Sequence, residues 1–570
     1  MSLDRVRALY GKQEPDFAKF VPKDEHNQVR LRGDTLYIYL KPNLVTVGIV
    51  KGLTGRQFHQ TPREHWTAPL TLGNVMDLQS AGFALCPQTE AWIADLFSTP
   101  KINSHLIIPG LLHPLHPYQI EGVQKIDHWG GRALLADDPG LGKTAQAIAW
   151  GLWKWKSPTL ILCPAFLKFN WKDEIVFWTG NKSIQIIEGR KLVAIWGEYV
   201  IANYDVLTDG EFLRGDLADI QWRLLIIDEC HYVSSPLATR TIMTKAIAKG
   251  IPHIIPISAT PGKSRPAELY TAINMVNPKV FPSFRKYGDR YCGPRMEIGG
   301  ITYKGSSNEF ELHDLLTKTV MIRRKKQDVF KQLPAKIRIP VILDGVIGDD
   351  YRQEDEVLRS KKKATFYEFE PLKQAAVRAK MPAAIAWLRN MLETEDKLVV
   401  YADHKETVDT LMAEFGDIAV KVDGRVTNTE ARKDAVYQFQ RCARCGVKKE
   451  YHGRDDAACD EYQVDKTIRM FIGTKAAKEG GTLTAANHVI FMELWWSVSD
   501  HEQGEDRAYG RAGDLHGATC WYLILKDSVE EEIADIIGLK DRRMTKIKDG
   551  KLVSPDMVLT ELIKRHKEIV

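Results

Sequence analysis

Two series of short apolar runs follow one another along the chain, with helical stretches between the runs. The first series lies between Arg132 and Pro261 and contains RALLADD, TLILCPA, EYVIANYDVL, WRLLIIDE and HIIPISATP. The second lies between residues 397 and 527 and contains KLVVYADH, IAVKVDG, TIRMFIGT, HVIFMEL and CWYLILKD. Continuous apolar runs of this length are typical of buried parallel strands with helical crossovers. The pattern therefore predicts an α/β chain with two parallel-sheet domains in tandem.

The segments outside the two series set the expected domain boundaries. A chain of 570 residues is too long for one hydrophobic core, and about three or four units are expected. Basic runs at 323–326 and 359–363 lie between the series, and such runs are typical of solvated faces. We predict an N-terminal unit over 1–110, a first lobe over 111–340 with a helical protrusion from about 265, a second lobe over 341–526 that begins with a helical segment, and a C-terminal helical brace over 527–570.

Composition narrows the class of protein. The hydrophobic fraction of 44% and the charged fraction of 27% are those of an ordinary soluble globular protein. No apolar run approaches the ~18 residues that span a membrane, and the polar start MSLDRVRALYGK indicates no secretory signal. The net charge of +5 is compatible with a nucleic-acid partner. Without a secretory signal, the eight cysteines indicate a reducing compartment rather than a disulfide scaffold.

A candidate phosphate loop lies in ADDPGLGKTAQAIAW, between a predicted strand and a predicted helix. Gly142, Lys143 and Thr144 match the end of the G-x-x-x-x-G-K-[ST] pattern, but Asp137 occupies the position of its first glycine. Backbone N–H groups and a helix N-terminus at such a turn favour phosphate binding. Gly140 and Gly142 would give the loop its tight path. Lys143 would reach the β- and γ-phosphates and the Thr144 hydroxyl would hold Mg²⁺, unless the stretch is a relic or a chance match.

Two carboxylates end the apolar run LLIIDECH. Asp228 at the strand tip can hold Mg²⁺, and Glu229 can orient and deprotonate an attacking water. Acidic residues at a strand end are often plain surface residues, but a phosphate loop and an acid pair in this order on separate strands disfavour that alternative. Ser258 and Thr260, in the SAT after the next strand, are candidates for a hydroxyl-bearing coupling element. The sequence therefore predicts a working nucleotide site without the first glycine.

These residues resemble the motifs of superfamily-two helicases and translocases. DDPGLGKT is similar to the D-E-x-G-L-G-K-T of Swi/Snf-type ATPases, which also lack the first glycine, and QGEDRAYGRAGD at 503–514 resembles the last motif of the superfamily. LHPYQIEGV, CPAFLKFNWKDEI and IANYDVL resemble other motifs of the first lobe. VVYADHKETVDTL, VDGRV and AAKEGGTLTAANHVIFMELWW resemble those of the second lobe, in family order. The resemblance runs from about Leu115 to Lys526 and implies two tandem RecA-like lobes.

The resemblance also implies a DNA-dependent ATPase that uses ATP and Mg²⁺, and it implies a role for each matching residue. Gln119 would read the adenine, Mg²⁺ would be held by Thr144 and Asp228, and Ser258 and Thr260 would couple the lobes. The implied ATP-binding residues are Gln119, Asp138, Pro139, Gly140, Leu141, Gly142, Lys143, Thr144, Gly480 and Gln503. The implied catalytic residues are Lys143, Asp228, Glu229, Arg507 and Arg511.

A narrower resemblance is to the annealing-helicase branch with HARP domains, whose members rewind DNA and remodel forks. RPAELYTAINMVNPKVFPSFRKYGDRYC and MIRRKKQDVFKQLPAK resemble segments of that branch. VKGLTGRQFHQTPREHWTAPL, residues 50–70, resembles its substrate-recognition HARP domain, with a K-x-x-x-G-R turn and a W-x-x-P-L strand. The alternative for this N-terminal unit is a generic small α+β domain with Trp66 in its core.

The last motif departs from the family pattern. Family members usually place the second arginine seven residues after the glutamine, but from Gln503 that position is Gly510, and Arg511 follows one residue later. Arg507 and Arg511 are four residues apart and would share one face if the segment were helical. Either of them can therefore be the arginine finger.

An insertion over 441–463 is the second departure, and it carries metal-ligand spacing. Cys442-x₂-Cys445, then His452 and Cys459, supply four ligands suited to tetrahedral Zn²⁺. Gly446 directly after the second cysteine fits the turn of a zinc knuckle, and metal binding can supply the folding energy of so polar a loop. The alternatives are an unliganded loop and a redox pair. Other candidates are Asp455 or Asp460 in place of the histidine, and Lys448, Lys449 and Arg454 for a basic surface toward DNA.

We therefore expect an ATP-driven translocase of double-stranded, forked or branched DNA, acting as a monomer by strand annealing, fork regression or branch migration, with contact to single strands. It would act in the cytoplasm of a bacterium or a phage-infected cell, or in the nucleus of a eukaryote. Two other functions stay open: a remodeller that displaces proteins from DNA, and a structure-specific DNA-binding protein whose ATPase has decayed, which the shifted arginine would favour.

Overall fold

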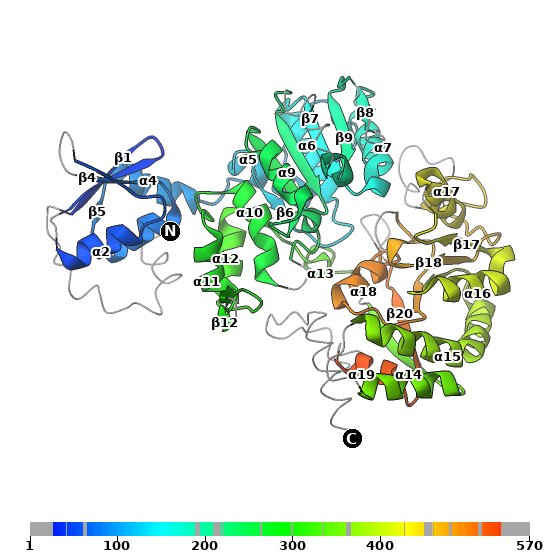
Figure 1. The fold of residues 1–570 in the computed structure, drawn as a ribbon. Coiled ribbons are helices and arrows are strands. Elements are labelled where there is room, and N and C mark those ends of the chain that lie inside the picture. Colours follow the sequence, from blue (N-terminus) through cyan, green and yellow to red (C-terminus); the bar gives the residue numbers. More distant parts are fainter. Residues whose placement is uncertain are drawn as a thin grey trace. The chain divides into compact units, whose positions relative to one another are not determined.

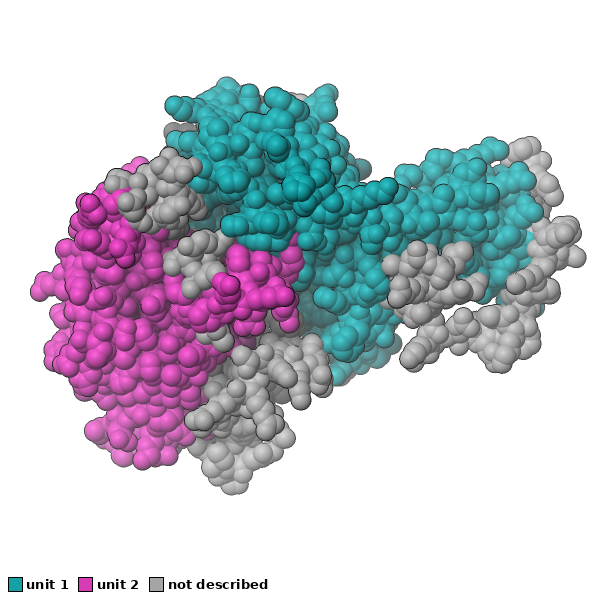
Figure 2. All heavy atoms as spheres, turned by 180° about the vertical axis from the view of Figure 1, so that it is seen from behind, with its two compact units in different colours: residues 1–137, 142–323 teal, residues 138–141, 324–570 magenta. Residues whose placement is uncertain are grey.

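The computed structural model (Figure 1) describes residues 27–40, 43–60, 65–187, 194–208, 217, 220–262, 265–297, 300–334, 336–360, 366–426, 428–449, 459, 461–477, 481–510 and 516–536. The chain divides into two compact units (Figure 2): residues 1–137 with 142–323, and residues 138–141 with 324–570. His452, Gly480, Arg511 and most of the expected C-terminal brace lie outside the described residues. Among the helices that are described, none has both the length and the apolar character needed to cross a membrane.

A five-stranded sheet begins the first unit, in the order β3-β4-β2-β1-β5. Alternate residues of β2 are buried, Leu36 and Ile38 among them, as expected for a sheet with one face on a core. Asn43 caps α2 by accepting hydrogen bonds from the N–H groups of Val45 and Thr46. The elements are β1 (Gln28–Arg32), β2 (Thr35–Tyr39), α2 (Leu44–Gly52), β3 (Gln57–His59), β4 (His65–Pro69), α3 (Leu72–Ser80), β5 (Ala84–Leu85) and α4 (Pro87–Leu96).

The first lobe is built on a parallel seven-stranded sheet, in the order β14-β6-β11-β10-β7-β9-β8. All five apolar runs of the first series form strands of this sheet, which confirms the predicted α/β class. The two edge strands, β8 and β14, have only three and two residues and therefore gave no apolar run. The strands are β6 (Leu134–Leu135), β7 (Thr159–Cys163), β8 (Ile184–Ile186), β9 (Tyr199–Asn203), β10 (Leu224–Asp228), β11 (His253–Ile257) and β14 (Met321–Ile322).

Helices alternate with these strands and extend the lobe after β11. The extension docks on the N-terminal domain, since the Leu72 N–H donates to the Lys279 carbonyl at 2.8 Å and Lys286 pairs with Asp77 at 2.9 Å. The elements are α5 (Pro117–His128), α6 (Lys143–Trp153), α7 (Lys168–Thr179), α9 (Thr239–Ala248), α10 (Tyr270–Val276), α11 (Phe284–Tyr291), β12 (Arg295–Glu297), β13 (Gly300–Thr302) and α12 (Glu309–Thr319).

The second lobe, in the second unit, has a parallel six-stranded sheet in the order β15-β20-β19-β16-β18-β17. The five runs of the second series form five of its strands, so the chain has two tandem RecA-like lobes as expected. The sixth, β15, lies at the edge and contains Pro340, which such a position tolerates. The strands are β15 (Ile337–Leu343), β16 (Leu398–Tyr401), β17 (Ala419–Val422), β18 (Met470–Gly473), β19 (His488–Phe491) and β20 (Thr519–Leu525).

A long helical segment precedes the first central strand of the second lobe. That segment, α15, has 29 residues and contains two prolines. A fully buried ion pair between Lys380 on α15 and Glu530 on α19, 2.6 Å long, joins the two helices. The helices are α13 (Lys326–Val329), α14 (Asp349–Ser360), α15 (Phe366–Thr394), α16 (Lys405–Phe415), α17 (Thr429–Gln440), α18 (Val498–Glu505) and α19 (Val529–Ile536).

Candidate functional site

The predicted phosphate loop joins β6 to α6. Gly140 and Gly142 have φ values of +81° and +70°, in the left-handed region where glycine is favoured. A Cβ atom on Gly142 would lie 2.2 Å from Nε2 of Gln119, so the side chain of Gln119 packs directly against the loop backbone. Gln119 itself is held by the His116 N–H, which donates to its Oε1 at 2.9 Å. The loop thus has the close backbone path that a phosphate cradle needs.

Asp137 stands where the usual first glycine is missing, and it is fully buried. Its carboxylate accepts a hydrogen bond from Nε2 of Gln146 at 3.1 Å, and its carbonyl accepts one from Nζ of Lys143 at 2.8 Å. Both donors lie on α6, the helix that follows the loop. Asp137 therefore connects the start of the loop to this helix. Burial lowers the pKa of Lys143, while the carboxylates of Glu229 and Asp137 act in the opposite direction.

The acid pair lies at the carboxyl end of β10, on the same edge of the sheet as the loop. The indole N–H of Trp171 donates to Asp228 Oδ2 at 2.8 Å, and the Glu229 N–H donates to Oδ1 at 3.0 Å. Burial, followed by the charge of Glu229, raises the pKa of Asp228 to about 7. A bound cation would reverse this effect, because it favours the ionised carboxylate. A hydroxyl and a carboxylate oxygen, from Thr144 and Asp228, are the ligand types that Mg²⁺ prefers.

Glu229 is fixed by the SAT segment after β11. Its backbone has φ +49°, which is uncommon for a residue other than glycine and costs about 1–3 kcal/mol. The Ser258 hydroxyl donates to Glu229 Oε2 at 3.1 Å, and the Thr260 N–H donates to that same hydroxyl at 3.2 Å. His231 Nδ1 lies 3.2 Å from Glu229 Oε2. The carboxylate is therefore connected to the end of the neighbouring strand through Ser258, whereas Thr260 contributes its backbone.

Arg323 is part of this site, although the sequence did not single it out. Its guanidinium donates to the carbonyl oxygen of Ala136, before the phosphate loop, and to that of Ala259 in the SAT segment. The interpretation of 323–326 as a solvated basic face is wrong for Arg323 and for Lys326. The Lys326 side chain is only 3% exposed and its Nζ lies 4.5 Å from the centre of the Tyr509 ring. Met321 and Ile322 form the buried strand β14. The basic run follows this strand directly and therefore begins inside the lobe rather than on its surface.

In the second lobe, the last motif begins on α18 and continues in a turn. Gln503 is buried on the helix, which ends at Glu505, and residues 506–508 form the turn. Arg507 therefore lies outside the helix, while Arg511 is not among the described residues. Nη1 of Arg507 donates to the Gly481 carbonyl at 3.2 Å.

Glu505 is a residue of this motif that the sequence analysis missed. It is fully buried and accepts hydrogen bonds from Nζ of Lys336 at 3.0 Å and from Nε and Nη2 of Arg338 at 2.6 and 2.7 Å. The Tyr522 hydroxyl donates to it as well. Although burial acts to raise its pKa, the charges of Lys336 and Arg338 hold it well below the ordinary value. This network fastens the end of α18 to β15 and β20.

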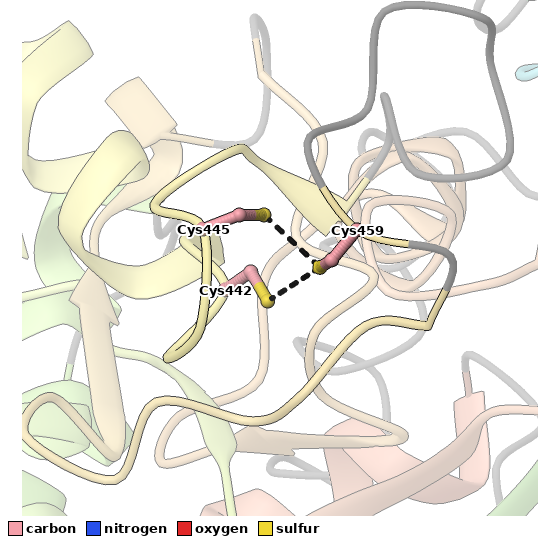
Figure 3. A group of neighbouring side chains, drawn as sticks. All are labelled: Cys442, Cys445 and Cys459. Atoms are coloured by element: carbon pink, nitrogen blue, oxygen red, sulfur yellow. Dashed lines mark hydrogen bonds between the residues drawn. The ribbon is translucent and has the colours of Figure 1, made fainter.

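Three cysteines of the predicted insertion lie together in the second lobe (Figure 3). The Sγ atom of Cys459 is 3.8 Å from that of Cys442 and 3.3 Å from that of Cys445, and all three lie within 4.8 Å of one another. None forms a disulfide. Gly446 has φ +73°, as the knuckle turn requires. Burial acts to raise the pKa of Cys442, but three backbone N–H groups outweigh it and bring the pKa to about 6.

One face of the N-terminal sheet carries aromatic, histidine and arginine side chains. The guanidinium of Arg30 lies 5.6 Å from the centre of the Tyr39 ring, and that of Arg32 lies 5.2 Å from that of Tyr37. The His65 ring stacks beside both tyrosines, at 5.6 and 5.8 Å between ring centres. Trp66, on the opposite face, packs at the edge of the hydrophobic core. We call the first set of five residues the aromatic–arginine face.

Comparison with known proteins covers both lobes. Residues 118–344 match the SNF2-related domain and residues 383–513 match the helicase conserved C-terminal domain. The Xenopus laevis "SWI/SNF-related matrix-associated actin-dependent regulator of chromatin subfamily A-like protein 1" is 29% identical over 475 residues, covering 80% of this chain and 46% of that protein. The Bos taurus "DNA annealing helicase and endonuclease ZRANB3" is 30% identical over 472 residues, covering 78% of this chain and 41% of that protein.

The chain therefore spans less than half the length of these two relatives. Among solved structures, the "Sulfolobus solfataricus SWI2/SNF2 ATPase core in complex with dsDNA" is similar at 22% identity with a TM-score of 0.38, covering 80% of this chain and 98% of that one.

Proposed function

The chain belongs to the SNF2-related helicase family, and we propose that it is a DNA-dependent ATPase that moves along forked or branched DNA and reanneals its strands. The observation that carries this proposal is the bonded series Thr260–Ser258–Glu229 beside Asp228, on the sheet edge that also presents the phosphate loop. A carboxylate fixed in this way can hold and deprotonate a water molecule near the γ-phosphate.

Each residue of the first lobe then has a defined task. The backbone of the loop would receive the phosphates, and Lys143 would exchange the Asp137 carbonyl for phosphate oxygens. Gln119, which packs against Gly142, would read the adenine. When bound with ATP, Mg²⁺ would supply positive charge that offsets the charge of the phosphates. The Thr144 hydroxyl and the Asp228 carboxylate would hold that ion.

The second lobe would complete the site with Gly480, Gln503 and an arginine finger, which is Arg507 or Arg511. A finger is worth about 10³–10⁵ in rate in related phosphoryl transfers. Because the finger comes from the other lobe, hydrolysis would require the lobes to close, and repeated closing and opening would step the protein along DNA.

The aromatic–arginine face is our candidate for recognition of forked DNA by a HARP-like domain over 1–110. Arginine guanidinium groups attract phosphates, and aromatic faces stack with unpaired bases without sequence preference. A fork offers both features, because duplex and single strands meet there. One of the relatives is named a DNA annealing helicase, which is consistent with such a substrate.

Arg30→Ala/Tyr37→Ala is expected to weaken binding of forked DNA by about tenfold, since one base stack is worth roughly 1–3 kcal/mol. ATP hydrolysis stimulated by blunt duplex should stay near the wild-type rate. Fluorescence anisotropy with forked and blunt DNA measures the first effect, and phosphate release measures the second. Lys101→Ala, which removes an exposed cation of the same N-terminal unit, is the control. An equal loss with both DNAs would contradict the assignment of the face to forks.

We also propose that the three thiols bind a structural Zn²⁺. At a Zn–S distance of about 2.3 Å, tetrahedral geometry separates two sulfurs by about 3.8 Å, close to the arrangement of the cysteine cluster. His452 is our candidate for the fourth ligand, with Asp455 and Asp460 as alternatives. All three lie outside the described residues. Four protein ligands would leave no open position for catalysis.

Two other functions would give different assay results. A structure-specific DNA-binding protein with a decayed ATPase would hydrolyse no ATP with any DNA. A remodeller that displaces proteins would be stimulated equally by blunt duplex and by forks. Phosphate release measured without DNA, with blunt duplex and with forked DNA separates these cases, and we expect the highest rate with forks.

A further inference from the structure

Segment 481–486, which precedes β19, is bonded to Arg507 through both side chain and backbone. Nη1 of Arg507 donates to the Gly481 carbonyl at 3.2 Å, and the Leu483 N–H donates to the Arg507 carbonyl at 2.8 Å. Thr482, Leu483 and Thr484 are each no more than 3% exposed. The direction of the Arg507 side chain therefore depends on where this segment lies.

The other side of the segment is held by residues that flank the first cysteine pair. Nζ of Lys449 donates to the Thr484 carbonyl at 2.8 Å, and Oε1 of the fully buried Gln440 accepts from the Ala485 N–H at 2.6 Å. Gly481 has φ +98°, and a Cβ there would lie 3.2 Å from the side chain of Val436 on α17. We expected Lys449 on a basic surface that faces DNA. Its side chain instead contacts segment 481–486 of its own lobe.

The knuckle, residues 441–449 with Cys459, has little apolar material to hold it in shape. Its backbone is closed by the Cys442 N–H, which donates to the Val447 carbonyl at 2.8 Å, and by bridges from Arg441 to Lys448 and from Cys442 to Val464. The three thiols occupy its centre (Figure 3). A metal ion bound by these thiols can supply the free energy that the knuckle needs to fold.

We infer that Zn²⁺ in the knuckle is a brace for the catalytic site of the second lobe. The metal shapes the knuckle, and the knuckle places Lys449. Lys449 then holds segment 481–486 together with Gln440 at the end of α17, and the segment orients Arg507. Lys449 acts as a positioning residue. The inference rests on the proposed zinc site and on the proposed ATPase. Metal loss should consequently lower turnover while leaving nucleotide affinity unchanged, because the phosphate loop belongs to other parts of the chain.

The test uses Lys449→Met in the whole 570-residue chain, which keeps the three thiols and most of the length of the side chain but removes the donor. We expect one zinc per chain by elemental analysis, as in the wild type, and unchanged affinity for a fluorescent ATP analogue. DNA-stimulated kcat should fall about tenfold, the effect of losing one charged hydrogen bond. Amide hydrogen exchange at Leu483 and Ala485 should become faster. Lys449→Arg should restore both properties. Lys466→Met, which removes an exposed lysine that pairs with Asp396 in the same lobe, is the matched control and should change neither.

Cys442→Ser/Cys445→Ser should lose the zinc and show the same changes in kcat and in exchange. Absence of zinc from the wild type would overturn the metal site and with it the brace. Zinc in the wild type with unchanged exchange and kcat in Lys449→Met would overturn the brace alone. If the wild type hydrolyses no ATP, the proposed function fails, while the exchange of Leu483 and Ala485 still decides whether the knuckle holds the segment.

Discussion

Glu229→Gln is expected to lower DNA-stimulated ATP hydrolysis by at least about 100-fold, the smaller end of what a general base contributes. The amide has nearly the size of the carboxylate and can still accept the hydrogen bond from Ser258, so the site should keep its shape. It cannot take a proton from water, however. Phosphate release with saturating forked DNA measures the loss, and binding of a fluorescent ATP analogue should be unaffected.

The matched control is Glu121→Gln, which removes an acid that pairs with Lys125 on the surface of α5. Surface pairs of this kind contribute little, so its rate should equal the wild-type rate. Lys143→Ala should also stop turnover, but with weaker nucleotide binding, because its ammonium is expected to contact the phosphates. Near-normal hydrolysis in Glu229→Gln would show that another group activates the water.

Glu505→Gln is expected to lower the free energy of unfolding of the second lobe by about 3–5 kcal/mol, the usual result of removing one partner from a buried ion pair. The substitution would remove the buried carboxylate that Lys336 and Arg338 share, and Lys336 would keep only its pair with Asp506. Urea denaturation followed by tryptophan fluorescence measures the change. Glu502→Gln, one turn earlier and 3.7 Å from Arg338 on a side chain that is 38% exposed, is the control and should cost far less.

The difference in free energy of unfolding between wild type and Glu505→Gln should depend on pH, and the pKa of Glu505 determines the direction of that dependence. The folded pKa of Glu505 is depressed, so its stabilising contribution is fully present above the unfolded pKa of about 4.3 and is lost as the pH falls toward the folded value. The gap between wild type and Glu505→Gln should therefore be constant from about pH 6 to 8 and narrow in acid. A gap that widens on acidification would contradict the assignment.

Much of the fold could be predicted because buried parallel strands leave continuous apolar runs. All ten runs became strands, whereas β8, β14 and β15 were missed because edge strands are short or half exposed. The places of the loop after β6 and of the acid pair at the end of β10 could also be predicted, since phosphate and metal chemistry requires specific residue types at fixed spacing. Their roles in ATP hydrolysis stay a prediction. The tolerance for Asp137 could not be derived from the motif, because it depends on Gln146 and Lys143 on the following helix.

Residues that act through tertiary contacts gave no local signal. In the sequence, Arg323 is one member of a basic run and nothing distinguishes it from the others. In the structure, its guanidinium donates to two carbonyls that lie 187 and 64 residues away in the chain. In the sequence, Glu505 is one polar residue inside a motif. Its partner Arg338 lies on the edge strand β15 and Lys336 directly precedes that strand, which the apolar pattern did not predict. The cysteine spacing predicted the cluster of thiols, while the contact of Lys449 with Thr484 depends on how two loops pack.

We propose above all that this chain converts ATP hydrolysis into movement of a DNA junction. The most direct measurement follows a forked substrate whose arms carry a fluorophore and a quencher, so that reannealing of the parental strands changes the signal. With ATP and Mg²⁺, the wild-type protein should move the junction, and Glu229→Gln should bind the fork without moving it. Hydrolysis of ATP by the wild type with no movement of the junction would contradict the claim.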